Sequence, residues 1–168
     1  CRDVFLNAKI FIITLGLNEC WEYLPDGAVA SRFPKSSLHA ALFRHKILTI
    51  SENLHNLQTF LKILRSYNPE IQIVVSVSPI PCLATGRASD THVIAANEHS
   101  KATLRVVAEE FVNNNLGTYY FPGYELVTRC IKNPWDQDQR HVSSSTIAKV
   151  MQLFEIMFAS DDGRIIKF

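Results

Sequence analysis

The sequence predicts an α/β domain built around a parallel sheet. Two apolar, β-branched runs, residues 9–15 and 71–77, have the pattern of strands that are covered on both faces. A helical segment separates them and a second one follows, and strands joined through helices of this length pair in parallel with right-handed crossovers. The 168 residues, of which 47% are hydrophobic and 20% charged, fit a single globular domain over residues 1–168.

The first half of the chain is expected to hold a strand, a long loop and a helix. The strand at 9–15 ends at Gly16. Residues 19–37 contain two prolines and a glycine and are interpreted as a long loop, followed by a helical or mixed stretch at 38–44. Ser51 is expected to cap a helix at 52–67, in which four leucines form one apolar stripe: Leu54, Leu57, Leu61 and Leu64.

The second half is expected to add two strands and two long helices. The strand at 71–77 is followed by a helix at 91–113, a short strand at 118–121 and a helical turn at 122–128. Ser143 or Ser144 is expected to cap the last helix, which runs to Phe158. The buried faces are expected to hold Leu104, Val107, Ala108 and Phe111 in the first of these helices, and Ile147, Val150, Met151, Phe154 and Phe158 in the last.

Composition excludes several classes of protein. The 17 basic and 16 acidic side chains give a net charge of +1, which argues against a strongly basic nucleic-acid binder. The apolar runs are too short for a membrane span. The four cysteines form no C-x-x-C pair and are expected to be free, mostly buried thiols. No signal peptide is visible, and we expect a cytoplasmic location.

The segment Asp138-Gln139-Arg140-His141, just before the last helix, contains a candidate general base. A carboxylate three residues before a histidine can accept a hydrogen bond from the imidazole Nδ1–H, which leaves Nε2 free to take a proton. Taken alone, this short spacing favours a solvated loop in which Asp138 or Ser143 only caps the helix.

Gly16-Leu17-Asn18-Glu19 follows the first strand and offers a second candidate. Glycine lets the backbone approach a ligand closely, and the Asn18 side-chain amide can donate to a developing oxyanion. Taken alone, the segment is more typical of an ordinary turn. Ligands of parallel sheets bind beyond the carboxyl ends of the strands, and both candidate segments are predicted to lie at that edge.

Other residues are weaker candidates. Ser100 and Lys101 are neighbours on a helix and point about 100° apart, which disfavours a Ser–Lys dyad. Asp136, Asp138 and His141 lack the further ligands that would complete a metal shell. No Walker loop and no G-x-G-x-x-G motif occurs, so we expect no metal and no cofactor. His39, His45 and His55 are expected to be surface or loop histidines, and His92 and His99, near the start of a helix, have no evident partner.

Five segments follow one another in a specific order: TLGLNECW at 14–21, VSVSPIP at 75–81, ANEHSKATLR at 96–105, YFPGYE at 120–125 and DQRHVS at 138–143. This order resembles the GSCFA-domain family, a branch of the SGNH (GDSL-like) hydrolase superfamily, over about residues 10–158. The resemblance implies a three-layer α/β/α, flavodoxin-like fold. It also implies a serine esterase or acyltransferase site that acts on O-acyl esters, such as acetyl esters, of a carbohydrate.

The resemblance assigns roles to four residues. Gly16-x-Asn18 is similar to the superfamily's oxyanion-hole block, with Glu19 in place of its aspartate. Asn18 would be an oxyanion donor. Asp138-x-x-His141 matches the block in which the histidine is the general base and the aspartate orients it. Trp21, Ser78 and Tyr124 match family-typical positions without an assigned role.

The chain departs from the family at its start. The Gly-Ser-Cys-Phe-Ala block, whose serine would be the nucleophile, is absent from this sequence. A second oxyanion donor, a glycine in the superfamily, either lies in the missing part or cannot be placed. The chain starts at Cys1 without a methionine, so we expect the nucleophile and the first strand of the sheet to lie upstream. The alternative is a non-catalytic module, a pseudoenzyme that binds a saccharide or a protein partner.

Overall fold

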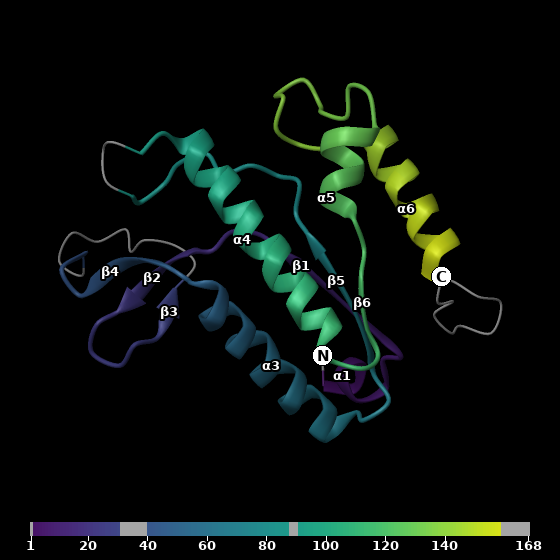
Figure 1. Ribbon diagram of the computed structural model, residues 1–168, viewed down its shortest axis with the longest axis horizontal. Coiled ribbons are helices and arrows are strands. Elements are labelled where there is room, and N and C mark those ends of the chain that lie inside the picture. The colour runs from purple at the N-terminus through teal and green to yellow at the C-terminus, as the bar shows by residue number, and fades with distance from the viewer. Residues whose placement is uncertain (1, 31–39, 88–90, 159–168) are drawn as a thin grey trace.

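Helices flank a three-stranded parallel sheet in the computed structural model, which describes residues 2–30, 40–87 and 91–158 (Figure 1). The sheet contains β1 (Ile10–Leu15), β5 (Gln72–Val77) and β6 (Thr118–Tyr120), in the order β1-β5-β6. Both strand pairs are parallel. The predicted α/β class is therefore confirmed, and helices on both faces fit a three-layer α/β/α arrangement.

Strand β5 lies at the centre of the sheet because its apolar run has no polar face. Residues 73, 74, 75 and 77 are completely inaccessible to solvent. Side chains alternate between the two faces along each strand, so odd and even positions of β5 join different cores. On its other side β1 forms the edge of the sheet, and within the described ranges no strand pairs with it there.

Two long helices cover one face of the sheet. They are α3 (Ile50–Tyr67) and α4 (Val93–Asn113), which lie side by side in Figure 1. The expected leucine stripe of α3 packs there, with Leu61 and Leu64 buried and Leu54 and Leu57 partly buried. All four apolar residues expected on the inner face of α4 are buried, and the core between helices and sheet is formed by Leu61, Leu64, Ile71, Ile73, Val75, Ala108 and Phe111.

Helix α6 (Ser144–Phe158) covers the opposite face, where Val74, Phe121 and Phe158 form a second buried cluster. The expectation that Ile147 and Met151 point inward is wrong, because they are 51% and 46% exposed. They lie in the first half of α6, beyond the part that packs on the sheet, and line a cavity instead.

A second, antiparallel sheet replaces the long loop expected at 19–37. It contains β2 (Glu19–Tyr23), β3 (Val29–Ala30) and β4 (Phe43–Ile47), in the order β3-β2-β4. Pro25, Asp26 and Gly27 form the turn of a β-hairpin, in which Tyr23 N–H donates to the Ala28 carbonyl at 2.7 Å. The helical or mixed stretch expected at 38–44 is wrong for its last two residues, which belong to β4; residues 31–39, including His39, lie outside the described ranges.

The remaining elements mostly agree with expectation. The short helix α5 (Gly123–Glu125) and the π-helical turn η1 (Leu126–Cys130) form the helical turn expected at 122–128. Helix α1 (Arg2–Asn7) was not expected. Thr49, not Ser51, caps α3. Three cysteines of the described ranges are free thiols, but the expectation that they are mostly buried is wrong, because only Cys20 of the three is buried. No helix in these ranges is long and apolar enough to cross a membrane.

Candidate functional site

A tight loop before α6 brings the predicted base and carboxylate together. Trp135 and Val142 form an isolated antiparallel bridge, and Asp136 N–H donates to the His141 carbonyl at 2.7 Å. Gln139, at the tip, has a positive φ of 54°, a left-handed conformation that closes the turn. These backbone contacts fold the D-x-x-H segment back on itself, so its first and last side chains meet.

The Asp138 carboxylate holds both the loop and the imidazole. Its Oδ1 accepts from the backbone N–H groups of Arg140 at 3.0 Å and His141 at 2.9 Å. Its Oδ2 contacts Nδ1 of His141. These hydrogen bonds lower the pKa of Asp138 to about 2, and the bond from the His141 backbone N–H has the largest effect. The carboxylate is therefore ionised at neutral pH and can only accept hydrogen bonds.

The neighbours of His141 also define which ring nitrogen carries the proton. Asp138 accepts at Nδ1, so a proton resides there. A guanidinium nitrogen of Arg140 lies 3.3 Å from Nε2 and can only donate, so Nε2 presents its lone pair. This is the tautomer that a general base requires. Arg140 occupies the position from which a hydroxyl would donate to Nε2. No pattern in the sequence predicts this contact.

His141 lines a cavity of about 430 Å³ between the first half of α6 and the carboxyl ends of β1 and β5. Its walls are largely apolar, and contributors include Ile12, Ile80, Phe121, Val127, Ile147, Val150, Met151 and Phe154. A larger cavity of about 540 Å³ lies at the amino end of β6, but no acidic, basic or histidine side chain lines it. The cavity beside His141 is therefore the candidate site.

Three hydroxyl-bearing residues also line this cavity: Thr14, Ser76 and Ser78. Thr14 and Ser76 are direct partners in the parallel register of β1 and β5. Ser78 lies two residues further, on the same face of the chain. No role is predicted from the sequence for these hydroxyls. The alternation of S-V-S with the buried valines was a signal that both serines share the face opposite α3 and α4.

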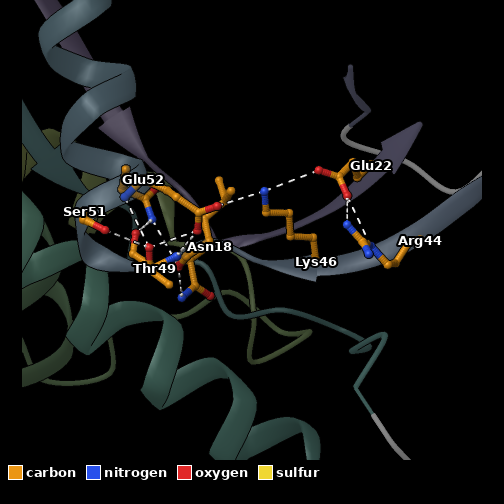
Figure 2. A network of polar contacts seen from close by, with 9 residues as sticks. Asn18, Glu22, Arg44, Lys46, Thr49, Ser51 and Glu52 are labelled. Atoms are coloured by element: carbon orange, nitrogen blue, oxygen red, sulfur yellow. Dashed lines mark hydrogen bonds and ion pairs between the residues drawn. The ribbon is translucent and has the colours of Figure 1, made fainter. Parts of the chain in front are cut away.

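Asn18 and Gly16 lie at the carboxyl edge of β1 but do not line the His141 cavity. Asn18 is fully buried. Its side-chain Nδ2 donates to the Leu48 carbonyl at 3.2 Å, and Leu48 N–H donates back to the Asn18 carbonyl at 2.8 Å. Asn18 therefore ties the end of β1 to the residue before the Thr49 cap of α3. Figure 2 shows Asn18 beside Thr49.

The same region anchors the antiparallel sheet to α3. Lys46, on β4, lies between two carboxylates, 3.4 Å from Glu22 and 2.8 Å from Glu52 (Figure 2). Thr49 and Glu52 form a reciprocal capping box at the start of α3. The hydrogen bond from Lys46, followed by those from Thr49, lowers the pKa of Glu52 to about 2. The first turn of α3 is thus a fixed support for the turn at Asn18.

Glu19 joins the antiparallel sheet to the loop that follows β5. Its carboxylate accepts from Arg87 Nε at 2.7 Å. Burial acts to raise the pKa of Glu19, but the hydrogen bonds from its neighbours outweigh it and hold the pKa below its usual value. The loop approaches closely because residue 86 is glycine, where a Cβ would lie 2.3 Å from the His45 ring. The other groups that contact the carboxylate are Thr85, the Gly86 backbone and His45.

Three of the other histidines have structural partners, and His45, which was expected on the surface or in a loop, belongs to β4. His45 contacts Glu19 at 3.1 Å. His92 caps α4 by accepting from Ile94 N–H, and His99 lies 3.0 Å from a guanidinium nitrogen of Arg87. Within the described ranges, no group of three or more His, Cys, Asp or Glu side chains is placed to hold a metal ion.

Helix α4 supports both loops at this edge through three polar residues on one face. Asn97 Oδ1 accepts from Cys82 N–H at 3.1 Å, in the loop after β5. Ser100 Oγ accepts from Asn18 N–H at 2.7 Å. Lys101 Nζ donates to the Gly16 carbonyl at 2.8 Å. The spacing i, i+3, i+4 places all three on one side of the helix, which explains the polar NxxSK segment.

Lys101 makes stability depend on pH. Its side chain is 2% exposed, and burial lowers the pKa of the amine from 10.5 to about 8. Between these values the unfolded chain binds more protons, so we expect the free energy of unfolding to rise with pH, by about 3 kcal/mol in all. Lys101→Met should abolish this rise, and Lys62→Met should retain it. Urea unfolding between pH 7.5 and 10.5 measures the effect, and identical profiles for all three proteins would contradict it.

The sequence matches known proteins at the level of family. Comparison with curated proteins and with solved structures gives no significant match. Residues 1–154 match the GSCFA family. This match covers most of the chain, including the turn at Gly16–Asn18 and the Asp138–His141 pair. The chain therefore belongs to the GSCFA family.

Proposed function

We propose that this domain works as a serine esterase or acyltransferase of the SGNH type on O-acyl esters of a carbohydrate. The observation that carries the proposal is the Asp138–His141 pair, in which the carboxylate contacts Nδ1 of an imidazole that lines the cavity and Arg140 lies beside Nε2. An imidazole in this state takes a proton from a hydroxyl and later returns it to a leaving group.

The proposal requires a nucleophilic serine, which we place on a segment outside residues 1–168 that pairs with the outer edge of β1. Within the described ranges no strand pairs with this edge of β1, and Ile12 on β1 is 52% exposed, which supports this placement. The serine Oγ forms a bond to the ester carbonyl carbon as its proton moves to Nε2 of His141. The carbonyl oxygen becomes an oxyanion at the turn formed by Gly16–Asn18. The proton then passes to the departing alkoxide, and water or another hydroxyl releases the acyl group by the reverse steps.

The cavity supports an apolar acyl group as the bound part of the substrate. Its lining is largely apolar, and its volume of about 430 Å³ exceeds what an acetyl group fills. The alcohol part, which we propose to be a sugar, would lie toward solvent, where His141 is 56% exposed. We therefore expect acetyl esters to be the smallest substrates rather than the only ones.

A cavity-filling variant tests this assignment in the full-length protein. Turnover of p-nitrophenyl esters from acetyl to octanoyl should be measurable, and Val150→Phe should lower the octanoyl-to-acetyl ratio of kcat/KM at least about tenfold, because it fills space beside the acyl chain. Val106→Phe is the matched control, on the far helix layer at a 42% exposed position. Absence of turnover for every ester would contradict the proposal and favour a binding module. An unchanged ratio would show that this cavity does not bind the acyl group.

A further inference from the structure

We propose that Lys101 is a positioning residue of the oxyanion site, which holds the turn at Gly16–Asn18 from the side of α4 and places a positive charge there. The inference rests on the proposed acyl transfer and keeps the Asn18 side chain as the oxyanion donor. It adds to that donor a buried cation for which no role is predicted from the sequence.

Two consecutive residues of α4 hold the turn. Ser100 Oγ accepts from Asn18 N–H at 2.7 Å, and Lys101 Nζ donates to the Gly16 carbonyl at 2.8 Å. Both contacts join residues that the structure describes, and both lie on the face of the sheet that α4 covers rather than along the outer edge of β1. The backbone of the turn is therefore fixed with respect to α4.

The Asn18 side chain is oriented from a second direction. Its Nδ2 carries two N–H bonds, and one of them is donated to the Leu48 carbonyl at 3.2 Å. This bond fixes the plane of the amide, and the second N–H is the one that the proposed function assigns to the oxyanion. Because backbone and amide are both held, the donor needs no reorganisation when negative charge develops.

The burial of Lys101 is unfavourable unless a negative charge meets it. Lysine is almost never fully buried unless it is paired, yet Lys101 is 2% exposed. Within the described residues no carboxylate contacts its amine, and its partner is the neutral Gly16 carbonyl. A neutral donor could satisfy this carbonyl without the cost of burying a charge. An oxyanion at the turn explains the ammonium group, because it supplies the opposite charge.

The groups around the amine determine where it titrates. Burial lowers the pKa of Lys101 to about 8, while Glu98, one turn earlier on α4, and Cys82, in the loop after β5, act in the opposite direction. Beyond Cys82 lie Glu19 on β2 and its partner Arg87. The turn itself and strand β5 contain no titratable side chain. The amine is therefore mostly charged at about pH 7 and mostly neutral at about pH 9.

This titration gives activity a pH dependence opposite to that of stability. Loss of the proton above about pH 8 removes the positive charge at the turn, so kcat should fall about 10–100-fold. KM should change little, because the oxyanion exists only in the transition state and the intermediates next to it. Stability rises over the same pH range, so a lysine with a purely structural role predicts no such loss of activity.

Replacing Lys101 separates its charge from its hydrogen bond. Lys101→Gln removes the charge and keeps an N–H donor, and Lys62→Gln is the matched control at an exposed position of α3. Hydrolysis of p-nitrophenyl acetate by the full-length protein should slow above about pH 8 in the parent and in Lys62→Gln. Lys101→Gln should already be about 10–100-fold slower in kcat at about pH 7, with KM nearly unchanged and no further fall above about pH 8.

The pH profile of the parent needs no substitution and covers the case in which Lys101→Gln does not fold. A parental kcat that stays level to about pH 9.5 would overturn this inference alone, provided that His141→Ala is inactive. So would a Lys101→Gln variant with the kcat and pH profile of the parent. A fully active His141→Ala, or a parent that turns over no ester, would overturn the proposed function as well.

Discussion

Replacing His141 with alanine should lower kcat/KM for ester hydrolysis by about 10³-fold or more in the full-length protein. The imidazole is the group at the cavity whose tautomer suits proton transfer, with Asp138 on Nδ1 and Arg140 on Nε2. Without it the attacking hydroxyl keeps its proton and the leaving alkoxide receives none. The fold should survive, because the side chain is 56% exposed.

His55→Ala is the matched control for this substitution. His55 is exposed on α3, on the opposite layer from His141, and should be replaceable without loss of activity. Steady-state kinetics and thermal unfolding of both variants separate loss of function from loss of structure. Turnover of His141→Ala within tenfold of the parent would remove His141 from the chemistry.

Asp138→Asn should lower kcat by about 10³–10⁴-fold while the loop keeps its shape. The asparagine Oδ1 still accepts from the backbone N–H groups of Arg140 and His141. Its amide, however, can present an N–H to Nδ1 of His141, which moves the ring proton to Nε2. The base then offers no lone pair to the nucleophile.

Asp136→Asn provides the comparison within the same loop. The Asp136 carboxylate accepts from Gln137 N–H, a bond that asparagine keeps, and it does not contact the imidazole. Imidazole ¹⁵N shifts should show the proton at Nδ1 in the parent and in Asp136→Asn, and at Nε2 in Asp138→Asn. An Nδ1 proton with normal turnover in Asp138→Asn would show that the carboxylate does not set the tautomer.

The parallel sheet could be predicted because the apolar pattern that indicates its strands lies within short stretches of the sequence. The runs at 9–15 and 71–77 are apolar at nearly every position, which only a strand covered on both faces requires. The antiparallel sheet was missed because β2 and β4 are short, half exposed and rich in charge, and their pairing joins residues far apart in sequence. The cap of α3 could have been predicted from the sequence, because Thr49-x-x-Glu52 has the form of a capping box.

The candidate site also contains one part that the sequence predicts and one part that it does not. Asp138 and His141 lie three residues apart, so a short motif was enough to predict their contact. The environment of the turn at Gly16–Asn18 depends on α4, more than 80 residues further along the chain. No local pattern shows that Ser100 and Lys101 bond this turn, or that Asn18 becomes inaccessible. The spacing predicted which segments meet, and packing determined which atoms remain available.

The pairing of Asn18 with Leu48 has a consequence for how this domain can be altered. Asn18 lies directly before β2 and Leu48 directly after β4, and the two residues exchange hydrogen bonds. The chain therefore enters and leaves the antiparallel sheet at neighbouring positions. An excursion with adjoining ends can be shortened, exchanged or transplanted without stretching the chain around it. Residues 19–47 thus form a cassette, and a chimera that carries another member's cassette between Asn18 and Leu48 should keep the parallel sheet intact.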